Sequence, residues 1–145
     1  MVDTKNAAYG ALLLRLLTGV LFIVHGLIKL FVFTPAGTAG YFASLGLPGF
    51  FGPIIMVVEL VGGIALILGL QARWVSAILA LELLGAALFG HIHNGFGFAN
   101  PNGGGWEYPV MWALTQASLA MIGDGAHALW PSIGFQKRLE AREAI

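Results

Sequence analysis

A small set of polar side chains could do chemistry in this chain, because each lies within or beside a strongly apolar stretch. Carboxyl and imidazole groups can transfer protons, and an ammonium group can stabilise an anion. The predicted reactive site consists of His25, Lys29, Glu59 and Glu82. The residues expected to bind a cofactor or substrate at the entrance of that site are His91, His93, Trp106 and Glu107.

The entrance group lies in one glycine-rich stretch, "LFGHIHNGFGFANPNGGGWEYP", over residues 88–109. Its glycines let the backbone fold closely over the end of a helical bundle, so we predict that it forms the mouth of the site. The alternative is a flexible tether. The direction of the Glu107 side chain distinguishes the two, because a mouth requires this carboxylate to point toward the bundle axis. The alternative role for Glu107 is a plain capping group, since the helix dipole stabilises a carboxylate at a helix N-terminus.

His91 and His93 also leave a metal site open as an alternative. Together with His25 and a carboxylate from Glu59 or Glu107, they would offer nitrogen and oxygen ligands. The H-x-H pattern is weak evidence on its own, so whether a metal binds stays unknown from the sequence. The chain has no cysteine, which excludes disulfides, thiolate ligands and a thiol nucleophile of its own.

The composition indicates that these groups are held in a membrane. Of the 145 residues, 58% are hydrophobic and 10% are charged, whereas soluble domains carry about a quarter charged residues. The lipid bilayer is therefore the expected partner. A formal net charge of zero gives no basis for binding nucleic acid.

The apolar residues predict an all-α integral membrane protein, a single four-helix bundle with antiparallel up-down spans. About 20 apolar residues cross a bilayer, and Pro53, Pro109 and Pro131 support three of the span boundaries. A short interfacial helix is expected over residues 38–45. The predicted spans cover residues 11–33, 53–70, 74–92 and 109–130, and a cytoplasmic tail follows over residues 131–145.

Positive residues predict the orientation of these spans. Lys5, Arg15, Arg73 and the basic tail share one side, and the two loops on the other side, 34–52 and 93–108, contain no lysine or arginine. The positive-inside rule then places both termini in the cytoplasm, in a multi-pass protein of the inner (plasma) membrane. We expect Arg15 to extend to the inner surface, without a function, and His127 to form a solvated pair with Asp124.

The predicted spans bring the reactive groups to similar depths. At 1.5 Å per residue, Lys29 lies about 6 Å, Glu59 about 9 Å and His25 about 12 Å below the outer surface. Glu82 lies near the middle of the bilayer. We therefore predict a polar pocket in the outer half of the bilayer.

A charge in lipid is costly, so we expect Lys29 and Glu59 to form a direct or water-bridged pair. The alternative for that pair is a purely structural ion pair that fixes the helix register. Glu82 has no cation at its own depth and is expected to pair with His25 or to stay protonated.

Several motifs, in this order, resemble the DoxX family of small four-helix membrane proteins. They are "RLLTGVLFIVHGLIKL", "YFASLGLPG", "VVELVGGIALILGL" and "FGHIHNGFGF…GGGWEYP", and they extend over residues 15–125. The family's characteristic positions correspond to His25 with Gly26 and Lys29, to Gly46-Leu47-Pro48, to Glu59 with Gly62, and to the glycine run before Glu107.

The resemblance implies a four-helix bundle and an association with redox chemistry. Relatives include the membrane subunit of a thiosulfate:quinone oxidoreductase, and others are linked to thiol stress and to quinone or catechol detoxification. We therefore predict a redox-associated membrane protein that binds a quinone-like or small oxidisable substrate, with quinone as the expected cofactor. It could be the membrane subunit of an oxidoreductase that acts with quinone. A redox partner protein and a homo-oligomer are also expected. The alternatives are a non-catalytic scaffold that anchors redox enzymes and a small proton-coupled transporter.

Overall fold

The computed structural model describes residues 3–97, 99 and 103–132. Within this part of the chain the regular elements are all helices, which confirms the all-α class. The elements in chain order are α1 (Thr4–Leu27), the π-helical turn η1 (Ile28–Val32), α2 (Thr34–Ser44), α3 (Phe51–Leu68), α4 (Ala72–Gly85), the π-helical turn η2 (Ala86–His91), the 3-10 turn η3 (Ile92–Asn94) and α5 (Glu107–Ile122).

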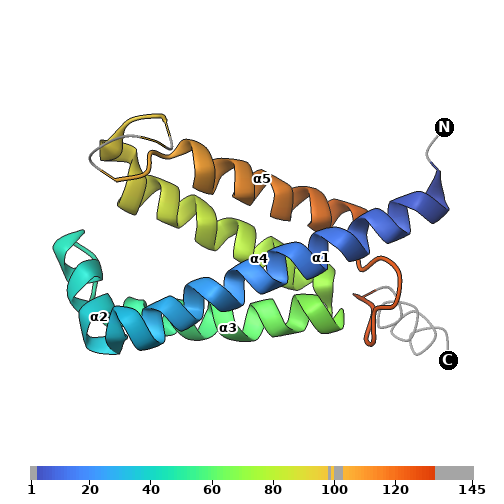
Figure 1. The fold of residues 1–145 in the computed structure, drawn as a ribbon, viewed down its shortest axis with the longest axis horizontal. Coiled ribbons are helices and arrows are strands. Elements are labelled where there is room, and N and C mark those ends of the chain that lie inside the picture. The colour runs from blue at the N-terminus through green and yellow to red at the C-terminus, as the bar shows by residue number, and fades with distance from the viewer. Residues whose placement is uncertain (1–2, 98, 100–102, 133–145) are drawn as a thin grey trace, which may run out of the picture.

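Helices α1, α3, α4 and α5 run lengthwise, and α2 lies across one end (Figure 1). We call this end, which also carries the connection from η3 to α5, the loop end. The opposite end carries the start of α1 and the segment after α5, and we call it the terminal end. Helix α1 packs mainly against α3, and α4 packs mainly against α5.

Three of the predicted membrane spans coincide with helices that have the length and composition of a membrane crossing. The helical stretches Asn6–Val32, Phe51–Leu68 and Ala72–Asn94 are long and apolar enough to cross a bilayer. Helix α5 has 16 residues, which is about 24 Å against a hydrocarbon core of about 30 Å. The fourth crossing therefore stays a prediction.

The short helix predicted between the first two spans is present as α2, and it begins earlier than expected. The chain turns sharply after η1, because Thr34 has a φ of 62° and Pro35 follows in the first turn of α2. The Thr38 hydroxyl then donates to the carbonyls of Thr34, at 2.9 Å, and of Lys29, at 3.4 Å. This contact ties α2 to the end of the first span.

The fourth helix ends at Ile122, so the predicted boundary near residue 130 is wrong. Gly123 and Gly125 have φ values of 104° and 72°, which cannot continue a right-handed helix. Residues 123–132 return instead across the terminal end. The amide of Ala126 donates to the carbonyl of Ala8 at 2.9 Å, and that of Trp130 donates to the carbonyl of Gly69 at 3.1 Å.

This return segment also corrects the expectation for Arg15. The Arg15 side chain is fully buried, and its Nη2 donates to the carbonyl of Ala126 at 2.7 Å. The carboxylate of Asp124 accepts bonds from the backbone amide and the hydroxyl of Ser132, at 2.7 and 2.8 Å. A buried guanidinium needs acceptors, and the return segment supplies one. Of the predicted tail, residues 133–145 lie outside the described residues.

Close packing of α1 and α3 depends on two facing glycines. A Cβ atom at Gly19 would lie 2.8 Å from the carbonyl oxygen of Gly63, and one at Gly63 would lie 2.7 Å from that of Gly19. The shared core beside this crossing contains Phe22, Leu66, Leu79 and Leu119, all without exposed surface. The two helix pairs therefore meet in a core that is largely apolar, although Ser76 and Gln116 are buried in it as well.

Candidate functional site

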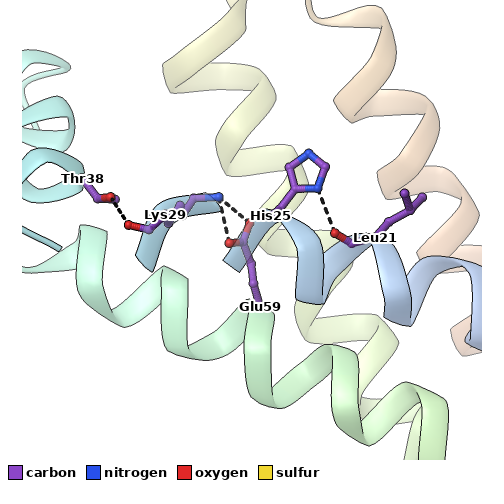
Figure 2. A network of polar contacts seen from close by, with 5 residues as sticks. All are labelled: Leu21, His25, Lys29, Thr38 and Glu59. Atoms are coloured by element: carbon purple, nitrogen blue, oxygen red, sulfur yellow. Dashed lines mark hydrogen bonds and ion pairs between the residues drawn. The ribbon is translucent and has the colours of Figure 1, made fainter. Parts of the chain in front are cut away.

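Lys29 and Glu59 form the ion pair that the matched depths predict. The Lys29 Nζ donates to Glu59 Oε1 at 2.7 Å and to Oε2 at 2.8 Å (Figure 2). Lys29 comes from η1, and Glu59 comes from α3 and is buried, with 4% of its surface exposed. A π-helical turn is uncommon and often occurs at functional sites, and here it carries the lysine.

His25 lies one helical turn before Lys29. Its Nδ1 donates to the carbonyl of Leu21 at 2.9 Å (Figure 2). A carbonyl can only accept, so Nδ1 carries the proton of this bond, and Nε2 of a neutral ring is left as a base. The ring lies edge-on to Trp112, with 5.2 Å between the ring centroids.

Glu82 and Trp112 bring polar atoms that have no partner among the described residues. These atoms are Glu82 Oε2 and Trp112 Nε1. Glu82 lies within electrostatic range of Glu59 and Lys29. Trp112 is 5% exposed and packs between Phe22, at a centroid distance of 4.5 Å, and Tyr108, at 5.8 Å.

These groups line one cavity of about 580 Å³ between the two helix pairs. The structure brings together five of the predicted site residues there, namely His25, Lys29, Glu59, Glu82 and His91. The remaining wall is largely apolar or aromatic. The further lining residues include Tyr41, Phe42, Leu45, Leu47, Phe51, Ile55, Leu83, Phe89, Tyr108, Pro109 and Trp112.

His91 connects the cavity to the glycine-rich stretch. Its Nδ1 donates to the carbonyl of Gly104 at 2.6 Å, and the Asn94 side-chain amide donates to the same oxygen at 3.3 Å. Gly104 itself lines the cavity. The π-helical turn η2, which carries His91, contributes Phe89 and Gly90 to the same wall.

The other three entrance residues are not part of the cavity wall. His93 is exposed, and Trp106 and Glu107 line a shallow groove of about 390 Å³ with Phe96 and Met111. The beginning of α5 explains this placement. Because the helix begins at Glu107, Tyr108 and Trp112 fall on its cavity face, and Glu107 and Met111 fall on the groove face.

A metal site has no geometric support in the described part of the chain. The described residues contain no group of three or more histidine, aspartate or glutamate side chains that could hold a metal ion. His91 and His93, which raised the alternative, differ in environment, since His91 lines the cavity and His93 is exposed.

The cavity reaches the side of the molecule as well as its interior. Tyr41 on α2 and Phe89 on η2 line it, and each has 50% of its surface exposed. The two segments approach each other here, since a Cβ atom at Gly90 would lie 3.1 Å from the Tyr41 hydroxyl. In a membrane-spanning chain, exposed aromatic residues near the ends of the spans are typical of the membrane interface.

Sequence reasoning missed Tyr41 and Trp112 as cavity residues. Trp112 lies near the beginning of the predicted span 109–130, where an aromatic residue is typical of the membrane interface. The signal that could have identified it is helical spacing, because Tyr108 and Trp112 lie four residues apart on one helix face. No comparable signal exists for Tyr41, since the direction of α2 depends on the turn at Thr34.

The fold and cavity define an all-α membrane protein with a mostly apolar cavity that holds a partly buried ion pair. The family model for DoxX matches residues 10–92, and the chain belongs to the DoxX family. The chain is 36% identical to the Bacillus subtilis protein named "Putative oxidoreductase CatD", over 89% of this chain and 90% of that protein.

Two further relatives match with similar identity. An uncharacterised protein of Haemophilus influenzae is 32% identical over 86% of this chain and 91% of its own length. The Escherichia coli "Inner membrane protein YqjF" is 37% identical over 55% of this chain and 61% of its own length. No solved structure matches the chain.

Proposed function

We propose that this protein is a redox-associated membrane protein whose cavity binds a quinone-like or small oxidisable molecule. The observation that carries the proposal is the cavity of about 580 Å³. Its size lies within the range of small-molecule sites, which are mostly apolar with a few convergent polar groups. A name of "Putative oxidoreductase" for the relative CatD supports the redox association.

The polar groups of the cavity fit proton exchange with such a ligand. His25 Nε2 is a free base in the neutral ring, and Glu82 has an unpaired carboxyl oxygen among the described residues. Glu59 holds Lys29 in place from the opposite helix. In this proposal His25, Glu59 and Glu82 exchange protons with the bound ligand. A quinone-like ligand accepts the electrons itself, whereas an oxidisable ligand gives them to a redox partner protein.

Access from the bilayer fits the chemistry of an amphipathic ligand. Tyr41 and Phe89 frame the exposed flank of the cavity, so a ligand dissolved in lipid can reach the cavity beside α2 and η2. A scaffold that only anchors other enzymes needs no such cavity. This difference favours ligand binding over the scaffold alternative.

Quinone retention by a cavity variant tests the proposal. Gly85 lines the cavity, and a Cβ atom there meets no atom within 4 Å, so Gly85→Leu adds bulk at the site from a position with open space at its Cβ. We expect the wild type, purified in mild detergent, to retain quinone detectable by mass spectrometry, and Gly85→Leu to retain several-fold less. Gly10→Leu, which also meets no atom within 4 Å but lies on α1 outside the cavity, is the matched control. Equal retention by all three proteins would refute the proposal.

A further inference from the structure

A shallow groove of about 390 Å³ runs along one face of α5, outside the cavity. The α5 residues that line it recur at helical spacing, so they form one stripe along the helix. They are Glu107, Val110, Met111, Leu114, Thr115 and Ser118. At 1.5 Å per residue this stripe is about 17 Å long, which is close to half of a hydrocarbon core of about 30 Å. The groove therefore has the length of one bilayer leaflet.

The surface of the groove is suited to a hydrocarbon chain. Met111 and Leu114 present exposed apolar side chains. The hydroxyls of Thr115 and Ser118 donate to the carbonyls of Met111, at 2.9 Å, and of Leu114, at 2.8 Å. These bonds within the helix satisfy both hydroxyl donors. An acyl chain can thus lie in the groove without leaving a hydroxyl hydrogen unpaired.

The loop end of the groove carries a fixed aromatic pair. Phe96 and Trp106 line it and pack edge to face, with 4.9 Å between their ring centroids. The amide of Glu107 donates to the carbonyl of Phe96 at 3.1 Å, and that of Trp106 donates to the carbonyl of Gly95 at 3.1 Å. These backbone bonds hold the pair where α5 begins. Aromatic rings at the end of a span are typical of the membrane interface, the level of lipid headgroups.

The charge at this end of the groove favours a cationic headgroup. Glu107 is exposed and lines the groove, and residues 93–108 contain no lysine or arginine. A primary ammonium group forms a charge-assisted hydrogen bond with a carboxylate. An anionic headgroup without an amine finds no basic side chain in this stretch. A second copy of the chain fits less well, because a two-fold axis along the membrane normal would bring the two Glu107 carboxylates toward each other.

We infer that the α5 groove binds an acyl chain of a phospholipid with a primary-amine headgroup, and that Glu107 binds its ammonium group. This inference takes α5 as the fourth membrane span, and it is independent of the ligand of the cavity. Glu107 is then a lipid-binding residue and not part of an entrance to the cavity.

Native mass spectrometry of the purified chain with added lipids tests the headgroup. We expect the wild type to retain dioleoyl-phosphatidylethanolamine several-fold better than the phosphatidylcholine and phosphatidylglycerol with the same acyl chains. Glu107→Gln removes the charge at nearly constant size, so it should retain phosphatidylethanolamine no better than phosphatidylcholine. Asp3→Asn removes an exposed carboxylate at the terminal end and should keep the preference. Equal retention of the three lipids by the wild type would overturn the inference.

A bulky side chain tests the location. Leu114→Trp fills the groove, and Leu13→Trp on α1 is the matched control, since the two leucines are 62% and 67% exposed. Neither tryptophan has to fit into the core. We expect Leu114→Trp to retain several-fold less phosphatidylethanolamine and Leu13→Trp to retain as much as the wild type. Equal retention by the two variants would overturn the inference. A dimer that Leu114→Trp dissociates would also overturn it, because the groove would then be an interface between copies.

Discussion

Among single residues, Lys29 and Glu59 are the charged groups whose pairing the apolar surroundings require most strongly. Two opposite charges at matched depth in apolar helices must meet, because lipid offers no other partner, and the structure pairs them at 2.7 Å. Trp112 and Tyr41 carry no charge, so nothing in the sequence requires them to face the cavity. The direction of Glu107 depends on where α5 begins, since a shift of one residue turns a side chain by about 100°.

Removing only one partner of the Lys29–Glu59 ion pair should lower the free energy of unfolding more than replacing both partners. Glu59→Leu leaves the Lys29 ammonium without its carboxylate, and a buried charge without a partner costs about 3–5 kcal/mol. We expect a value near the lower end, because the Lys29 side chain keeps 20% exposure. The double variant Lys29→Met with Glu59→Leu should recover much of this loss. Thermal unfolding in detergent measures both, and a double variant no more stable than Glu59→Leu would contradict the coupling.

At the scale of elements, hydropathy located the helices that cross the membrane and missed the segment that closes the terminal end. Residues 123–130 contain Asp124 and His127 as well as apolar residues, and Gly123 and Gly125 adopt positive φ values that end the helix. The two glycines alone do not reveal this conformation, because glycine also occurs within membrane helices. The π-helical turns η1 and η2 were not predictable either, since no residue pattern specifies them.

Gly125 should tolerate substitution poorly because of the return segment. Its φ is 72°, and a Cβ atom there would lie 2.6 Å from that of Ala11 and 2.8 Å from the carbonyl oxygen of Ala8. Gly125→Ala should therefore lower the free energy of unfolding by at least about 1 kcal/mol. Gly10→Ala, in α1 with open space at its Cβ, should raise it by up to about 1 kcal/mol, because alanine is the better helix former. Denaturation of the two variants side by side checks this contrast, and equal stability would refute it.

At the scale of the whole molecule, the confirmed features are the membrane location and the all-helical fold, and the orientation stays a prediction. The loop end carries the glycine-rich connection, and the terminal end carries the buried Arg15. The positive-inside rule places the loop end outside the cytoplasm. This orientation also requires α5 to cross the bilayer. Its 16 residues can do so only together with the backbone that flanks the helix.

Labelling from one side of the membrane decides this orientation. The chain has no cysteine, so a single Gly97→Cys substitution, with open space at its Cβ, reports the loop end alone. We expect an impermeant thiol reagent to label it in intact cells, and a reporter fused after Ile145 to be active only in the cytoplasm. A periplasmically active fusion at Ile145 would overturn the orientation.

We propose that the cavity between the two helix pairs, and not the groove along α5, holds a quinone-like ligand. Photo-crosslinking with an azido-quinone in native membranes, followed by peptide mapping, locates the bound ring. We predict crosslinks on the cavity's lipid-side flank, at Tyr41 of α2 and Phe89 of η2, that an excess of unlabelled quinone suppresses. Crosslinks confined to the α5 groove, at Met111 or Leu114, or crosslinks that excess quinone does not suppress, would contradict the claim.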